Sequence, residues 1–294
     1  MRRDAVFLPL MATLFGVAVL SLMDAFMKSA ALAAGAYSAT WLRSGMAALL
    51  AMPLWLGGGG KWPQKRVLKV HLKRGFVTSF MALTFFYALT KLPIAETIAI
   101  SFVAPLVALY LAAILLGETI RREAIIAALL GLAGTLVIIA GRIGRERMSE
   151  DAALGLAAIL FSALLYAWNL VIQREQAQLA GPAEIASFHG GVAFLVLGIA
   201  APFAFASPDG GALASIGISA VLTVAGAMSF AWAYARAEAQ TLVPIEYSGF
   251  LWAALFGWLF FGEAVTATTI AGALLIVLGC WIATRRRPPL PDRV

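Results

Sequence analysis

Charged side chains are scarce in this sequence. Asp, Glu, Lys and Arg together make up 13% of the chain, whereas a soluble globular domain carries about 25%. Hydrophobic residues account for 62%, and the mean hydropathy is +0.90; soluble domains are roughly 45–50% apolar. The composition therefore argues against a soluble globular protein and predicts an integral membrane protein.

Cysteine and histidine are nearly absent. Cys280 is the single cysteine, so no internal disulfide can form, and His71 and His189 are too few for a histidine metal site. The motifs H-E-x-x-H, G-x-S-x-G and G-K-[ST] are missing, which argues against a membrane-embedded enzyme. The lack of a glycine-rich carbonyl filter argues against a channel. We expect no catalytic residues, no cofactor and no metal.

Apolar runs bounded by glycine, proline or charge predict ten membrane-spanning helices. Their expected limits are 6–30, 37–56, 75–90, 94–116, 122–140, 152–173, 184–206, 213–235, 242–261 and 264–284. Ten helices of about 20 residues, joined by short loops, use up this length. The expected fold class is an all-α integral membrane protein.

One stretch, from Thr78 to Glu118, occurs again 145 residues later. In this register Thr78 matches Thr223, Phe85 matches Phe230, and Gly117-Glu118 match Gly262-Glu263. The chain therefore divides into two repeats, 1–148 and 149–294, of five spans each. Because five is odd, the second repeat must enter the membrane upside down. Inverted repeats are typical of secondary transporters, whose site lies at the repeat interface near the midplane.

The basic residues predict the orientation. With the N-terminus inside, sixteen Lys and Arg residues fall on the cytoplasmic side and four on the outer side, a strong positive-inside bias. Both termini are then cytoplasmic, and the protein lies in the plasma (bacterial inner) membrane. The net charge of +7 reflects topology and contact with membrane lipids, not nucleic acid. The basic block from Lys61 to Arg74 is interpreted as a solvated loop.

Charged residues within spans are candidates for function, since each costs about 2.5–3.5 kcal/mol at the centre of a helix. Asp24 and Lys28 are one turn apart and can pair, and Arg43 lies in the next span. These three residues form a predicted outer cluster. It either fastens the first two helices together or acts as a gate or a carboxylate site.

The repeat register places an inverted image of this cluster nearer the cytoplasm. Asn169 is the image of Asp24, His189 stands close to the image of Arg43, and Glu246 is the image of Ser101. We expect Asn169, His189 and Glu246 to form an inner polar cluster. His189 serves either in packing or in gating and proton coupling. Glu118 and Glu263, at helix ends, are given a mainly structural role.

A proline and several aromatic residues are candidates for shaping the cavity. Pro105 removes the backbone hydrogen bond to the Ser101 carbonyl and kinks the helix; this kink is either a tolerated irregularity or leaves an oxygen that accepts an ammonium group. Aromatic residues close to span midpoints or inner thirds are candidates for walls that contact a substrate. These are Trp168, Tyr247, Phe85, Phe102, Tyr87, Trp232 and Trp252, of which Trp168 and Tyr247 are the better candidates.

The motifs resemble the EamA-type branch of the drug/metabolite transporter superfamily. The resemblance rests on Arg43 early in the second span and on a fourth span containing Ala88-Leu89-Thr90, Ala95-Glu96-Thr97, Pro105 and Gly117-Glu118. The aromatic content of the first half is similar to that of YddG-type exporters of aromatic and other neutral amino acids. The second half departs from the pattern, with Phe250 in place of the proline and His189 or Phe188 in place of the arginine.

The resemblance implies export of an amino acid or similar metabolite by alternating access. Asn169 is expected to bind the substrate carboxylate and Glu246 or the Ser101 carbonyl its ammonium, while Trp168 and Tyr247 contact its side chain. The alternatives are a carrier of drugs or other metabolites with the same fold, an intramembrane enzyme and a channel.

Overall fold

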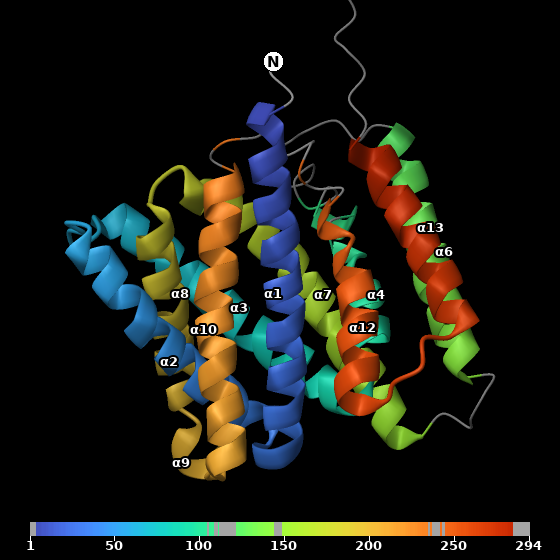
Figure 1. The fold of residues 1–294 in the computed structure, drawn as a ribbon, viewed down its shortest axis with the longest axis horizontal. Coiled ribbons are helices and arrows are strands. Elements are labelled where there is room, and N and C mark those ends of the chain that lie inside the picture. The colour runs from blue at the N-terminus through green and yellow to red at the C-terminus, as the bar shows by residue number, and fades with distance from the viewer. Residues whose placement is uncertain are drawn as a thin grey trace, which may run out of the picture.

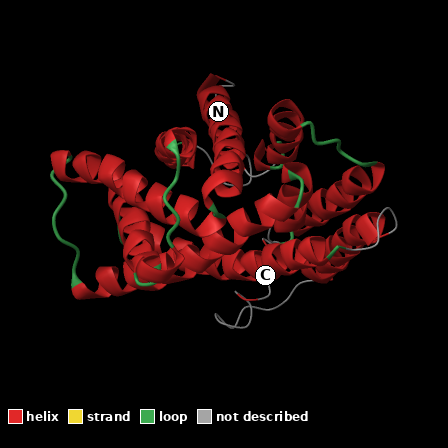
Figure 2. Cartoon of the chain, turned by 90° about the horizontal axis from the view of Figure 1, so that it is seen from below, coloured by secondary structure: helices red, strands yellow, loops and turns green. Residues whose placement is uncertain are grey.

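The computed structural model describes residues 4–104, 106–108, 111, 122–143, 149–234, 236, 242 and 245–284. Within these residues the elements are all helices, and Figure 2 shows them joined by loops without a strand. Their bounds are α1 Asp4–Ala34, α2 Ala36–Gly57, α3 Lys65–Lys91, α4 Ile94–Ser101, α6 Arg122–Ile143, α7 Glu150–Ala177, α8 Pro182–Gly198, α9 Ala201–Ala204, α10 Gly210–Tyr234, α12 Gly249–Phe261 and α13 Ala267–Thr284. The predicted all-α fold class is confirmed.

Three helices of the described chain are long and apolar enough to cross a membrane by length and composition. They are Phe7–Ala34, Glu150–Gln173 and Gly210–Ala233. Shorter apolar helices accompany them in α6, α8, α12 and α13. In the middle of a helical bundle, neighbouring helices and not lipid surround much of each helix, so polar residues interrupt the apolar runs there.

The structure corrects three of the predicted spans. α3 begins ten residues before the predicted limit, because Val70, His71, Arg74 and Val77 recur at helical spacing on a buried face. The seventh predicted span ends at Gly198, and the short α9 follows it. The fourth is interrupted by a turn at Phe102 and Val103. Pro105, the predicted cause of a kink there, lies outside the described residues, as does Glu118.

Each half of the chain packs helix by helix against the other half. α2 packs on α8 and α6 on α13, and in the repeat register each of these two pairs joins a helix to its own image. α4 packs on α12, the helix that follows the image of α4. α1 packs on α10 and α3 on α7, and these two pairs are images of each other. In Figure 1 the image pairs follow one another along the long dimension of the bundle, from α2 and α8 at one end to α6 and α13 at the other. This is the arrangement of two interlocked inverted repeats.

Glycines permit the closest helix crossings. Gly45 of α2 and Gly190 of α8 stand 145 residues apart, and each faces the other's helix. A Cβ atom on Gly190 would lie 2.8 Å from the Ser44 carbonyl oxygen. Gly134 of α6 and Gly272 of α13 face one another in the same way, each Cβ position 2.5 Å from the other's carbonyl oxygen. Small residues at these four positions let the backbones of the two halves touch.

Candidate functional site

Two helix breaks meet at the centre of the repeat interface. α4 ends at Ser101 and is followed by turn residues Phe102 and Val103; Tyr247 and Ser248 form the matching turn immediately before α12. The rings of Phe102 and Tyr247 pack edge to face with centroids 5.4 Å apart. These two residues are repeat images, so their contact marks the internal pseudo-twofold axis. Discontinuous helices at the midplane are where secondary transporters bind solutes.

Polar residues stand directly before both breaks. The Ser101 hydroxyl donates to the Thr97 carbonyl at 2.9 Å. Its image Glu246 is half-buried. Tyr166 of α7 interacts electrostatically with both Glu246 and Arg74. The centre of the interface therefore holds a carboxylate from one half and a guanidinium from the other.

Asn169 of the predicted inner cluster belongs to a buried polar network centred on Arg74, and from here on the name inner polar cluster is used for this network. Arg74 Nε donates to Asn169 Oδ1 at 2.9 Å and its Nη2 donates to Gln173 Oε1 at 3.1 Å, while its Nη1 donates to Gln176 Oε1. Arg74, Asn169 and Gln176 are 9%, 3% and 1% exposed. The cluster comprises Arg74, Asn169 and Gln176 together with His71 and Glu184. It joins α3 to α7 and α8.

The direction of the hydrogen bonds fixes the tautomer of His71. Arginine carries only donors, so the amide oxygen of Gln176 must face Arg74 and its amino group must face His71 Nδ1, 2.6 Å away. Nδ1 therefore accepts, and the ring proton resides on Nε2, which donates to Glu184 Oε1 at 2.9 Å. Phe188 stacks on the imidazole at 4.4 Å.

The direct hydrogen-bond partners of Arg74 in this network are uncharged, and the carboxylate of Glu184 is reached only through Gln176 and His71. All three acceptors of Arg74 are neutral amides, and neither of the two lysine–carboxylate ion pairs found in the described chain includes it. Three of the five N–H groups of a guanidinium are used, which leaves one N–H on each terminal nitrogen. A buried cation without a counter-charge is costly, so the site favours a ligand that supplies negative charge.

The predicted outer cluster is buried and touches both halves. Arg43 Nη1 donates to the Thr223 hydroxyl of α10 at 3.2 Å, and its guanidinium lies over the Phe86 ring at 5.1 Å. Asp24 interacts electrostatically with Arg43 but forms no ion pair in the part of the chain that the structure describes. His189 lies within electrostatic range of both Arg43 and Arg74.

Lys28 does not pair with Asp24 as the helix spacing predicted. It forms an ion pair with Glu263 and donates to the Leu92 carbonyl at 2.8 Å. The other Glu263 oxygen accepts from the backbone N–H of Ile94 at 2.8 Å, at the N-terminus of α4, where a carboxylate is favoured. Gly262 adopts a left-handed conformation with φ 64°, which turns Glu263 back toward the bundle.

Lys91 and Asp151 form a second link on the same side of the bundle as Lys28. The Lys91 ammonium donates to Asp151 at 2.6 Å, and this hydrogen bond raises the pKa of the lysine. Lys91 directly follows the third predicted span and Asp151 directly precedes the sixth, so their contact is consistent with the alternation of the predicted spans.

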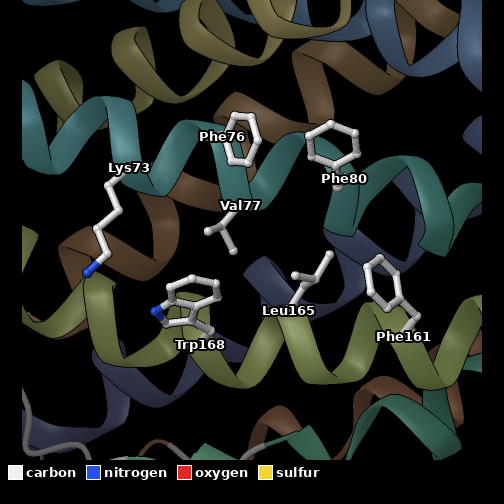
Figure 3. Close-up of a pocket in the computed structure, with 7 residues that line it drawn as sticks. All are labelled: Lys73, Phe76, Val77, Phe80, Phe161, Leu165 and Trp168. Atoms are coloured by element: carbon white, nitrogen blue, oxygen red, sulfur yellow. The ribbon is translucent and has the colours of Figure 1, made fainter. Parts of the chain in front are cut away.

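Trp168 faces away from the residues with which it was predicted to act. It is 41% exposed, whereas the adjacent Asn169 is buried, because successive residues of a helix point about 100° apart. Figure 3 shows Trp168 in a groove between α3 and α7, lined also by Lys73, Phe76, Phe80, Phe161 and Leu165. This peripheral position corrects the prediction that Trp168 lines the cavity together with Asn169.

The other predicted aromatic residues have separate positions. Trp232 is 39% exposed and stacks against the Arg236 guanidinium at 4.2 Å. Tyr87 lies under Lys91, and Phe85 packs against Phe86 within the core. Of the predicted aromatic residues, Phe102 and Tyr247 are the two that lie at the helix breaks.

Four residues of the inner polar cluster escaped prediction: His71, Arg74, Gln176 and Glu184. His71 and Arg74 lie in the basic block that was interpreted as a solvated loop, and this interpretation is wrong from Lys65 onward. Helical spacing with Val70 and Val77 was the available signal. The described residues contain no group of three or more His, Cys, Asp or Glu suited to a metal.

Comparison with known proteins yields a consistent set of relatives. The model of the EamA-like transporter family matches residues 8–140 and again 153–285. The pseudopaline exporter CntI of Pseudomonas aeruginosa (strain UCBPP-PA14) is 27% identical over 274 residues, covering 91% of this chain and 92% of that protein. The riboflavin transporter of Rhizobium johnstonii is 28% identical over 215 residues, covering 70% and 67%. A solved crystal structure aligns over 96% of this chain and 97% of its own, with a TM-score of 0.63 and 21% identity.

Proposed function

Because the chain belongs to the EamA-like transporter family, we propose that it exports small carboxylate-bearing metabolites, amino acids among them, by alternating access. The observation that carries the proposal is the buried guanidinium of Arg74, whose hydrogen-bond partners are all neutral. A guanidinium binds a carboxylate, like a phosphate, in bidentate geometry. An amino-acid carboxylate at this point supplies the missing charge.

The central residues offer the remaining contacts that an amino acid needs. Glu246 stands at the break before α12 and provides a negative charge for the ammonium group. Ser101 stands at the equivalent position before the other break, where its carbonyl is the alternative acceptor for this group. Phe102 and Tyr247 supply an aromatic surface for the side chain. This surface favours aromatic and other neutral amino acids over small polar ones.

Export requires that the inner polar cluster be reached from the cytoplasm. The excess of Lys and Arg on one side predicts that both termini lie in the cytoplasm. In a cysteine-free background made with Cys280→Ser, Gly58→Cys should react with a membrane-impermeant maleimide from the cytoplasmic face, and Asp209→Cys from the outer face. Labelling of both from one side would contradict the inverted arrangement.

Carriage of larger metabolites with several carboxylates is the second candidate. Two buried guanidiniums, Arg43 and Arg74, belong to the polar interior of the bundle, which favours a solute that carries more than one negative charge. The pseudopaline exporter is the relative with the fuller coverage of this chain, and the riboflavin transporter shows that relatives carry substrates larger than amino acids.

Flux into proteoliposomes tests the carboxylate requirement directly. Phenylalanine and threonine are compared with phenylalaninamide and phenethylamine, each with and without a proton gradient. We expect saturable, counterflow-competent flux of phenylalanine, weaker flux of threonine, and none of the two compounds that lack a carboxylate. Flux of phenethylamine equal to that of phenylalanine would overturn the role of Arg74. Flux only of compounds with several carboxylates would select the second candidate.

A further inference from the structure

The groove between α3 and α7 is an amphipathic pocket on the outside of the bundle. It has a volume of about 340 Å³, at the small end of the range for ligand pockets, roughly 300–1,000 Å³. Its walls are aromatic and exposed: Phe76 is 55% exposed, Phe161 50% and Trp168 41%. Figure 3 shows Lys73 at one end of the groove, with the phenylalanines extending away from it.

The charge at that end is positive and belongs to an ordered row. Lys73 Nζ lies 5.9 Å from the Trp168 ring centroid. Lys69 and Arg66 precede it by one and two turns on the same face of α3, and both are exposed. None of the ion pairs found in the described residues involves this row. The groove thus has positive charge at the end near Lys73 and apolar side chains along the rest of its length.

We propose that this groove binds one anionic phospholipid of the cytoplasmic leaflet. The phosphate of its headgroup lies at Lys73, and an acyl chain runs along Phe76, Phe80 and Phe161 toward the midplane. The basic row complements the charge of the headgroup, and tryptophan beside lysine is typical of the membrane interface. The groove is too small for an added helix, whose diameter is about 10–12 Å, which favours a lipid over a second copy of the chain.

The position of the groove connects the lipid to the transport site. Lys73 adjoins Arg74 in sequence, and Trp168 adjoins Asn169. The groove therefore lies on the outer surface of α3 and α7 at the level where Arg74 and Asn169 form their 2.9 Å hydrogen bond inside the bundle. A lipid that bridges α3 and α7 on the outside holds together the two helices that carry this bond on the inside. This consequence rests on the proposed function, whereas lipid binding itself does not.

Quenching of tryptophan fluorescence by brominated lipids tests the binding. The protein is reconstituted with increasing fractions of brominated phosphatidylglycerol or brominated phosphatidylcholine, and the contribution of Trp168 is obtained by subtracting the Trp168→Phe signal. We expect half-maximal quenching at an approximately fivefold lower fraction of the anionic lipid, which corresponds to about 1 kcal/mol for one basic residue.

Three variants separate the lysine from general surface charge. Lys73→Gln should remove most of the preference and Lys73→Arg should retain it. Lys61→Gln, which removes an exposed charge outside the groove, should leave it unchanged. Equal quenching by both lipids in the wild-type protein, or the same preference in Lys73→Gln, would overturn the proposal. Protection of Trp168 from both lipids, with a cross-linked dimer, would assign the groove to a second copy. Because no flux is measured, these results are independent of the proposed substrate.

Discussion

Lys28 of the first repeat and Glu263 of the second form an ion pair across 235 positions of sequence. Their side chains are 7% and 17% exposed, and the same carboxylate also accepts from the N-terminus of α4. The pair therefore fastens α1, α4 and the end of α12 to one another on one side of the bundle. This role agrees with the mainly structural role predicted for Glu263.

Removal of one partner should be more damaging than removal of both. In Glu263→Gln the buried ammonium of Lys28 loses its counter-charge, and we expect a loss of about 3–5 kcal/mol in the free energy of unfolding. The double variant Lys28→Met/Glu263→Gln should recover much of this loss. Thermal unfolding in detergent, arranged as a double-mutant cycle, measures both. Additive effects would show that the two side chains do not interact.

The missing anion at Arg74 can be supplied by a single substitution. Asn169→Asp places a carboxylate where Asn169 Oδ1 now accepts from Arg74, so the variant should fold normally but compete with a bound substrate. We expect the apparent affinity for phenylalanine to fall about tenfold or more, since a hydrogen bond to a charged group contributes about 1.5–3 kcal/mol.

Two control variants accompany that measurement of substrate affinity. Gln178→Glu adds the same charge at the exposed C-terminal cap of α7 and should not alter the affinity. Asn169→Ala removes one acceptor without adding charge and should weaken binding less than Asn169→Asp does. Unchanged affinity in Asn169→Asp would remove Arg74 from the substrate site.

The two image glycines of α2 and α8 should tolerate alanine unequally. A Cβ atom on Gly190 meets backbone atoms of Ser44 and Ala48 at 2.8 and 2.9 Å, whereas on Gly45 it meets the ring of Phe194. A ring can shift but a helix backbone cannot do so locally. Gly190→Ala should therefore cost about 1–3 kcal/mol and Gly45→Ala less, both measured by thermal unfolding. Gly191→Ala, with nothing within 4 Å, is the neutral control; equal losses at Gly45 and Gly190 would contradict this packing.

His71 should be observed as the neutral tautomer protonated on Nε2. The chain contains only two histidines, so nitrogen chemical shifts of protein labelled at histidine resolve both, and a His189→Gln variant assigns them. In Gln176→Leu the Nδ1 atom loses its amide donor, and we expect a mixture of tautomers. Protonation of His71 on Nδ1 in the wild-type protein would show that the Gln176 amide is reversed.

The sequence by itself determined the membrane class, the two repeats and their inverted relation. These properties depend on local runs and on a register, because a bilayer admits only segments that satisfy their own backbone hydrogen bonds. The register of 145 residues predicted that Phe102 and Tyr247 are equivalent, and the structure shows that the two rings touch. The expectation of a transporter and not an enzyme is confirmed by the family to which both halves belong.

Only the tertiary structure decided which side chains share a site. The sequence cannot state how far a helix is rotated about its axis, because that rotation depends on the neighbouring helices. Arg74 was therefore grouped with the solvated lysines around it, although it is buried against three amides. Trp168 was expected to face the same cavity as its neighbour Asn169, although the two side chains point about 100° apart and Asn169 is the buried one. Lys28 was predicted to pair one turn away, yet its carboxylate comes from the other repeat. A charge can find its partner wherever folding brings the two groups together, and for buried charges that position is set by packing.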